Sequence, residues 1–184
     1  MKVIIFGNLN KNYWYVLADS AVTNTGKPFY LPEDLGRVTV SLGFSLRISR
    51  LGKHISEKFA PRYYSEAAPT LHFKLHDYEK TLINSGLPSD AARSFDKSLV
   101  VGDFQTLDFS SNIELFINNE KQLEFNLKKL PYSIESVITE VSKINTLKMG
   151  DIILPGLSSE IFIKEGDLLE VKKNGERLFH VKVK

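Results

Sequence analysis

Acid–base chemistry needs groups that take up and release a proton, and this sequence places several of them between positions 72 and 80. An imidazole and a carboxylate can act as base and acid in turn, so His72, His76 and Glu79 are candidate catalytic residues. Asp77 and Asp96 are further carboxylates that could form an acid–base pair with them. Helix caps and solvated faces also account for many acidic residues, so both interpretations stay open for the carboxylates.

The two histidines could also be metal ligands, because a spacing of four residues on a helix brings two side chains together. Here, however, apolar and polar residues alternate from Leu71 to His76, which is typical of a β-strand. Four strand residues span about 13 Å at about 3.3 Å each. His72 and His76 are therefore expected to lie too far apart to bind one ion.

The composition excludes several classes of function. Cysteine is absent, which rules out disulfides, thiolate catalysis and a cysteine zinc site. The formal net charge of +2 is too small to indicate binding to nucleic acid or to a membrane surface. The apolar run from Val3 to Phe6 is shorter than a signal-peptide core, and no stretch approaches the roughly 20 apolar residues of a membrane span. We therefore expect a cytoplasmic protein with no nucleic-acid or membrane partner.

The elements that would position the candidate groups are mainly strands. Apolar residues recur at period two from Arg37 to Ser49, which predicts a long strand with Ser41, Gly43 and Ser45 on its other face. Val3 to Phe6 reads as a short buried strand. Residues 8–36 are rich in Asn, Pro, Gly and aromatic residues and are interpreted as a long ordered loop.

Two hairpins and two helices complete the prediction. Asn118-Asn119 separates strands at 113–117 and 121–125, and Asn174-Gly175 separates strands at 168–172 and 178–183. A helix is expected from Ser133, as N-cap, to Asn145, and a short one between Asp77, a candidate N-cap, and Gly86. A further strand is expected over 152–154.

Many strands, few helices and no alternation of strand and helix predict an α+β fold that is mostly β. An apolar share of 42% and a charged share of 25% are ordinary values for a globular chain with a packed core. A length of 184 residues fits one domain better than two. We see no linker or repeat, so the chain is expected to form a single domain over 1–184.

Several collinear segments together resemble the fumarylacetoacetate hydrolase family, whose members include hydrolases, decarboxylases, isomerases and hydratases of keto acids. These segments are RLGKHISEKFAPRYY (50–64), ARSFD (92–96), INNE (117–120), NTLKMGDIILPG (145–156) and IKEGDLLEV (163–171). The resemblance covers most of the chain from about Lys27 onward. It implies a rolled, mixed β-sheet structure with a few peripheral helices, usually as a homodimer.

The family uses Mg²⁺ or a similar hard cation, held by carboxylates, to bind a keto-enolate substrate. The resemblance places its Glu-x-Glu pair at Ser41 and Gly43, and its third metal-binding carboxylate at His72. Its catalytic lysine matches Arg93, and its threonine after the GD strand matches Leu157. A glutamine- and asparagine-bearing loop matches residues 123–128 and keeps only Asn126. The turn and strand segments thus still match the family, whereas the metal-binding and catalytic residues have been replaced.

These replacements remove the ligands that a hard dication needs, because Ser41 and Gly43 supply no charge and His72 prefers softer metals. We therefore expect no metal cofactor. Losing three carboxylates together with a dication leaves the pocket about one unit more positive. If the pocket stays open, it is expected to bind a small anion directly, with Arg93 as the bidentate donor and with Ser41, His72 and Lys74 beside it.

Such an anion site should weaken as the pH rises through the ordinary pKa of histidine, near 6.5. In the alternative, Leu157, Tyr63 or Tyr64 fills the vacated space and no pocket remains. Arg93 cannot replace the lysine as a base, because a guanidinium does not deprotonate in proteins.

Three hypotheses for function follow. In the first, the chain is a non-catalytic family member that acts as a binding or regulatory protein. In the second, it is an enzyme of the hydrolase, isomerase or decarboxylase class that acts on a small keto acid by altered, metal-independent chemistry. In the third, it is an unrelated β-rich binding module, in which the long strand would not run beside the RLGK turn.

Overall fold

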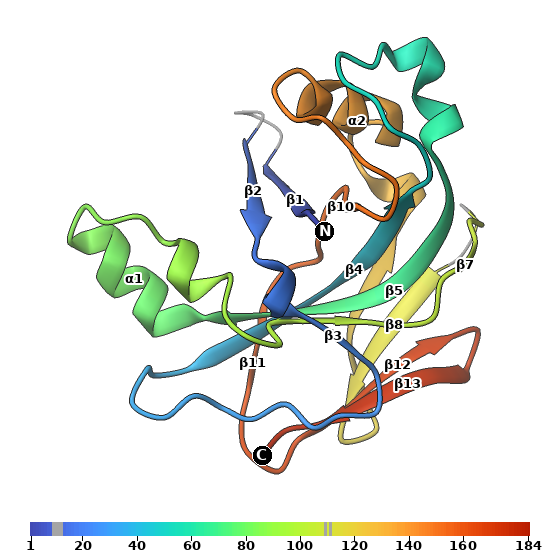
Figure 1. Ribbon diagram of the computed structural model, residues 1–184. Coiled ribbons are helices and arrows are strands. Elements are labelled where there is room, and N and C mark those ends of the chain that lie inside the picture. Colours follow the sequence, from blue (N-terminus) through green and yellow to red (C-terminus); the bar gives the residue numbers. More distant parts are fainter. Residues whose placement is uncertain (9–12, 109, 111) are drawn as a thin grey trace.

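The computed structural model describes residues 1–8, 13–108, 110 and 112–184 (Figure 1). These residues form two mainly antiparallel sheets, two short α-helices and several 3-10 segments, of which Glu57–Tyr63 is the longest. The larger sheet has the strand order β2-β1-β10-β4-β5-β6-β3, with β11 beside β4 and β7 beside β5. Its strands are β1 (Val3–Asn8), β2 (Tyr13–Leu17), β3 (Val22–Asn24), β4 (Val38–Ile48), β5 (Tyr64–Leu75), β6 (Leu99–Val101), β7 (Gln105–Thr106), β10 (Ile152–Leu154) and β11 (Ile161–Ile163). The predicted mostly-β α+β fold is confirmed.

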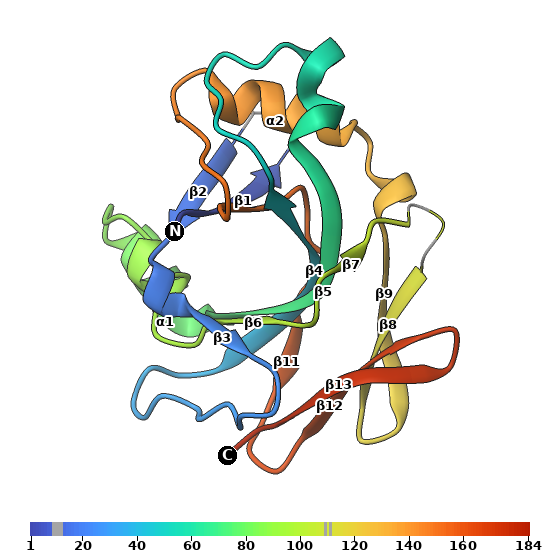
Figure 2. The same cartoon turned by 45° about the vertical axis from the view of Figure 1, so that its right-hand side comes forward.

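The larger sheet is rolled because its two ends are joined by a short connection. β2 and β3 stand at opposite ends of the strand order, yet only residues 18–21, which include a 3-10 turn, separate them in the chain. Figure 2 shows the sheet curling round so that β3 and β6 return toward β2. Val3, Ile5, Leu99 and Leu154 pack together in a small apolar core on one face of this curl.

The second sheet has the order β13-β12-β8-β9, built from two hairpins: β8 (Asn112–Ile117) with β9 (Glu120–Asn126), and β12 (Leu168–Lys173) with β13 (Glu176–Lys182). Both predicted turns are present. Asn118 and Asn119 have φ of 50° and 72°, and Asn174 and Gly175 have φ of 52° and 83°, the left-handed conformations that a two-residue hairpin turn requires. The main core lies between this sheet and the long strands of the first.

The helices lie at the periphery, as predicted. α2 (Ile134–Ser142) begins after Ser133, whose hydroxyl accepts a 3.0 Å bond from the Ser136 amide, and buries Val137, Ile138 and Val141. It ends before the predicted Asn145. None of the helices within the described residues is long and apolar enough to cross a membrane.

Helix α1 (His76–Asn84) differs from the prediction at its start. Its N-cap position is Leu75, not Asp77. Asp77 instead accepts two hydrogen bonds from the Arg37 guanidinium, of 2.8 and 2.9 Å, and a third from the Arg37 backbone amide. Gly86, with φ of 68°, follows the helix end as expected.

The interpretation of residues 8–36 as one loop is wrong at 13–17 and 22–24, where β2 and β3 form, whereas residues 25–36 contain no named helix or strand. Tyr13, Trp14, Tyr15 and Val16 are aromatic or β-branched, and such residues favour strands once a neighbouring strand supplies hydrogen bonds. Residues 9–12, part of the same predicted loop, lie outside the described residues.

Candidate active site

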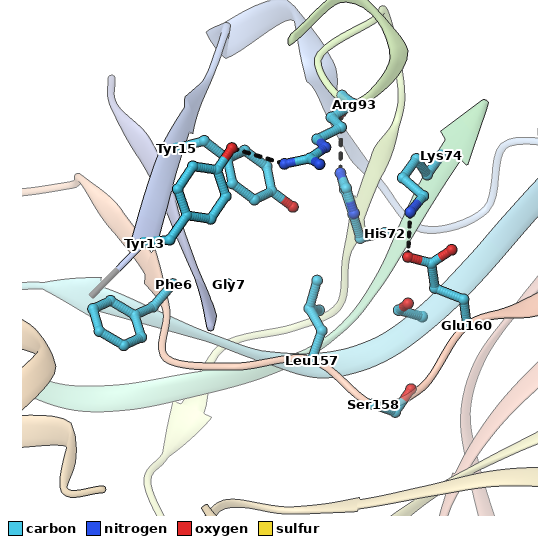
Figure 3. Close-up of a pocket in the computed structure, with 11 residues that line it drawn as sticks. Phe6, Gly7, Tyr13, Tyr15, His72, Lys74, Arg93, Leu157, Ser158 and Glu160 are labelled. Atoms are coloured by element: carbon cyan, nitrogen blue, oxygen red, sulfur yellow. Dashed lines mark hydrogen bonds and ion pairs between the residues drawn. The ribbon is translucent and has the colours of Figure 1, made fainter. Parts of the chain in front are cut away.

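A cavity of about 330 Å³ opens at the side of the rolled sheet where β1, β2, β4 and β5 approach the segment 157–160 (Figure 3). Its volume suits a small organic molecule. The vacated site is therefore open. Leu157 forms part of the cavity wall without closing it, while Tyr64 binds Glu135 and Tyr63 packs beside Gly52, away from the cavity.

The register of β4 and β5 brings the polar residues of this cavity together. Ser41 pairs with His72, and Thr39 pairs with Lys74. Because side chains alternate along a strand, the side chains at 39, 41, 72 and 74 share one face of the sheet. The apolar residues between them point into the main core, which explains why the long strand alternates so regularly.

His72 is a neutral base because it is buried, and the backbone of Arg93 sets its tautomer. Its Nε2 lies 3.0 Å from the Arg93 carbonyl oxygen. A carbonyl oxygen only accepts, so Nε2 carries the proton and Nδ1 keeps its lone pair. Burial lowers the pKa of His72 to about 4, so the ring is uncharged near neutral pH. The expected titration near pH 6.5 is thus corrected, because the ring is only 3% exposed.

Glu79 bridges the two cations of the site. Its Oε2 lies 2.6 Å from Lys74 Nζ, and its Oε1 accepts a 2.5 Å bond from Arg93 Nε. Burial opposes ionisation, but the hydrogen bonds from Lys74 and Arg93 outweigh it and lower the pKa of Glu79. A carboxylate with a lowered pKa and both oxygens engaged is a poor acid or base. Glu79 therefore positions Lys74 and Arg93 rather than exchanging protons.

Lys74 is also paired with a second carboxylate, that of Glu160, which lies on the cavity wall. The other oxygen of Glu160 accepts a 3.0 Å bond from the Thr39 hydroxyl. These contacts fix both the ammonium group and the Glu160 carboxylate at one side of the cavity (Figure 3).

Two tyrosines from β2 line the side of the cavity near Arg93. The Tyr13 hydroxyl accepts a 2.8 Å bond from Arg93 Nη1, and the guanidinium carbon lies 5.0 Å from the centre of the Tyr15 ring. Burial raises the pKa of the Tyr15 hydroxyl, so Tyr15 keeps its proton and can donate it in a hydrogen bond.

The cavity brings together four of the predicted site residues, Ser41, His72, Lys74 and Arg93, and leaves out two. His76 does not line it. The Nδ1 atom of His76 is buried without a hydrogen bond, 3.8 Å from a Glu160 oxygen, and its ring meets the edge of Phe162. Glu79 lies behind Lys74 and Arg93. Tyr13, Tyr15 and Glu160 also line the cavity and were not predicted, although the period-two spacing of the tyrosines indicates that they share one strand face.

The residues at the family's metal positions do not fit a hard cation. A Cβ added to Gly43 would lie 2.9 Å from Leu157 Cδ2 and 2.9 Å from the Gly156 carbonyl oxygen, so no carboxylate side chain can extend there. Ser41 and His72 leave one neutral hydroxyl and one imidazole. Among the residues that the structure describes, no group of three or more His, Asp or Glu side chains could hold a metal ion.

Comparison with known proteins decides the family. The model described as "Fumarylacetoacetate (FAA) hydrolase C-terminal" matches residues 5–180. The chain belongs to the fumarylacetoacetate hydrolase family. The hypothesis of an unrelated β-rich module is thereby excluded.

Relatives in this family carry names of enzymes. The chain is 27% identical over 182 residues to the mouse protein named oxaloacetate tautomerase FAHD1, covering 96% of the chain and 82% of that protein. It is 23% identical over 171 residues to oxaloacetate tautomerase YcgM of Escherichia coli K12, covering 89% and 78%.

Solved structures of the fumarylacetoacetate hydrolase family share the fold. A family protein from Yersinia pestis CO92 superposes with a TM-score of 0.90 at 23% identity, over 100% of this chain and 92% of that one. Fumarylpyruvate hydrolase from Pseudomonas aeruginosa, solved with Mn²⁺ and pyruvate, gives a TM-score of 0.85 at 16% identity, over 100% and 89%.

The first functional hypothesis, a non-catalytic binding or regulatory protein, is therefore wrong. The relatives are named as tautomerases, hydrolases and isomerases, which supports the alternative of an enzyme. The loss of the metal-binding carboxylates therefore does not imply a loss of catalysis. The pocket remains open and keeps a neutral imidazole, a protonated phenol and two cations.

Proposed function

We propose that this protein is an enzyme that transfers a proton at the carbon next to the carbonyl group of a small keto acid, without a metal ion. The observation that carries the proposal is the contact between His72 Nε2 and the Arg93 carbonyl, which leaves the lone pair of Nδ1 available as a base in a pocket that also holds Arg93 and Lys74. The enzymatic names of the relatives support it.

In this proposal the Arg93 guanidinium holds the substrate carboxylate. Its Nε donates to Glu79 and its Nη1 to Tyr13, so with respect to the described residues both Nη2 hydrogens and one Nη1 hydrogen remain for a substrate carboxylate. Orienting the substrate by its carboxylate places the neighbouring keto group and its adjacent carbon toward His72 and Tyr15.

The reaction is a keto–enol tautomerisation. His72 Nδ1 removes a proton from the carbon, the C–H electron pair forms the new C=C bond, and the carbonyl π electrons move to oxygen. Tyr15 donates a hydrogen bond to that oxygen, and the nearby cations of Lys74 and Arg93 stabilise its negative charge, the task that a metal performs elsewhere. A proton from solvent completes the enol, and His72 returns its proton to water.

Proton transfer suits this pocket better than the other two reaction classes. Hydrolysis needs a second base to activate water, and both nearby carboxylates, Glu79 and Glu160, are engaged by Lys74. Decarboxylation needs a strong electrophile at the keto group. Tautomerisation needs only one base and charge stabilisation.

The test is proton exchange in D₂O, followed by ¹H NMR, for 2-oxopentanoate and 2-oxoglutarate in the presence of EDTA. We expect exchange at C3 of at least one acid above the rate in buffer alone, and no gain when Mg²⁺ replaces EDTA. Exchange at the buffer rate for both acids under both conditions contradicts the proposed activity, and exchange that appears only with Mg²⁺ contradicts its metal independence.

A further inference from the structure

The charges around the cavity determine which keto acids it can hold. Among the described residues of the site, the cations Lys74 and Arg93 face the carboxylates of Glu79 and Glu160, and His72 is neutral. The charges of these four groups cancel. The positive shift expected from the lost carboxylates is relative to the family's metal site, whereas within this pocket Glu79 and Glu160 balance Lys74 and Arg93.

The two cations differ in what they can still bind. Among the described residues, the Nη2 hydrogens of Arg93 and one of its Nη1 hydrogens have no partner, so Arg93 can take one carboxylate. Lys74 lies between Glu79 and Glu160, with 14% of its side chain exposed. Its ammonium group is committed to two anions, so it can hydrogen-bond a keto oxygen but offers little net attraction to a second carboxylate.

Glu160 adds a repulsive element. It lines the cavity beside Lys74, away from Arg93 in Figure 3, and its position is fixed by Lys74 and by the Thr39 hydroxyl. A substrate anchored on Arg93 that carried a second carboxylate toward Lys74 would bring two like charges together in a partly desolvated pocket. Repulsion of this kind is a common way to obtain specificity against a close analogue.

From this arrangement, and resting on the proposed function for the placement of the substrate, we infer that the enzyme selects monocarboxylate keto acids over dicarboxylates and that Glu160 is the residue that rejects the second carboxylate. The expected substrate has one carboxylate for Arg93, a keto group beside it, and an uncharged far end of a size that a cavity of about 330 Å³ can enclose.

The test compares two acids with the same number of carbons, 2-oxopentanoate and 2-oxoglutarate, which differ by the terminal carboxylate. Dissociation constants are measured by calorimetry with EDTA, at pH 7.5 and low salt. We expect wild type to bind the monocarboxylate at least tenfold more tightly, and Glu160→Gln to bring the two constants within threefold. Glu176→Gln, which removes an exposed carboxylate on β13 outside the cavity, should keep the wild-type ratio.

Equal binding of the two acids by wild type, tighter binding of 2-oxoglutarate, or no binding of either overturns the inference, and the wild-type measurement alone is sufficient if Glu160→Gln does not fold. An unchanged ratio in a folded Glu160→Gln also overturns it. Selective binding without proton exchange would refute the proposed activity but not the inference about Glu160. Proton exchange without selectivity would refute the inference but not the proposed activity.

Discussion

The Arg93 carbonyl oxygen lies 3.0 Å from His72 Nε2, so the backbone of one predicted site residue fixes the tautomer of another. The side chain of the same arginine reaches Glu79 and Tyr13 on the other side. Arg93 thus connects the base, the buried carboxylate and the tyrosine edge of the pocket.

His72→Gln should abolish proton transfer while preserving the fold. The glutamine amide nitrogen can still donate to the Arg93 carbonyl, but the lone pair at Nδ1 is lost. We expect the rate of C3 proton exchange to fall by about 100-fold or more. Exchange at the wild-type rate in a folded variant would show that His72 is not the base.

Protein stability should fall as the pH drops from 6.5 to 4, and His72 should account for part of the loss. The folded-state pKa of about 4 lies below the ordinary value of 6.5, so the unfolded chain takes up the proton first as pH falls. The neutral His72 ring contributes about 3 kcal/mol to the unfolding free energy. This contribution is fully present above pH 6.5 and is lost progressively down to pH 4.

Urea denaturation of wild type and His72→Gln across that range measures this contribution. As the pH falls, the unfolding free energy of wild type should decrease by more than that of His72→Gln, because only wild type loses the contribution of His72. A pH-independent difference would contradict the lowered pKa. The same pKa predicts that proton exchange is independent of pH above about 5 and declines below it.

Glu79→Gln, which removes the carboxylate between Lys74 and Arg93, should destabilise the folded protein. Lys74 would keep Glu160, but Arg93 would lose its buried partner. We expect a loss of about 2 to 3 kcal/mol in unfolding free energy, because one partner of a largely buried ion pair is deleted.

Glu66→Gln provides the matched control for this loss. Glu66 pairs with Arg47 at 3.1 Å, but both side chains are more than 40% exposed. That variant should lose less than about 1 kcal/mol. Similar losses in the two variants would argue against the bridging role of Glu79.

Gly43→Ala should destabilise the protein although it adds one methyl group to a strand. The new Cβ would meet the Leu157 side chain and the Gly156 carbonyl, each at 2.9 Å. Overpacking of this kind costs about 1 to 3 kcal/mol. Adding Leu157→Ala should recover part of the loss, and thermal melts of the single and double variants would measure it. A single variant as stable as wild type would show that the segment 156–157 moves easily.

Assembly remains a prediction from the family resemblance. We propose a homodimer, the commonest form of soluble oligomer. Sedimentation velocity at tens of micromolar should give twice the chain mass of 20.9 kDa. A monomeric mass would contradict the proposal.

The parts of the fold that depend on local sequence could be predicted. Asn174-Gly175 sets its hairpin because both residues tolerate positive φ, and Ser133 caps its helix through an amide three residues away. His76 could not be placed in the same way. The change from strand to helix occurs at that residue, so the alternation that placed His72 in the pocket no longer applies to His76.

The missed site residues depend on long-range structure. Tyr13 and Tyr15 reach Arg93 only because the sheet curls, and Glu160 reaches Lys74 only because β11 pairs with β4. No local pattern encodes these approaches. The placement of Ser41, His72, Lys74 and Arg93 at the cavity followed instead from the family resemblance and from strand periodicity.

The short connection at residues 18–21 also has a consequence for folding. It joins the two ends of the strand order, so the hydroxyl of Tyr13 and the imidazole of His72 come to line one cavity only after the whole curl has formed. Contacts so distant in sequence form late, since the chain must lose its loop entropy before they contribute. Each hairpin of the second sheet pairs strands that are close in sequence, so these hairpins can form first. The protein should therefore acquire its secondary structure before its cavity, and a folding intermediate with native-like strands would lack the proposed activity.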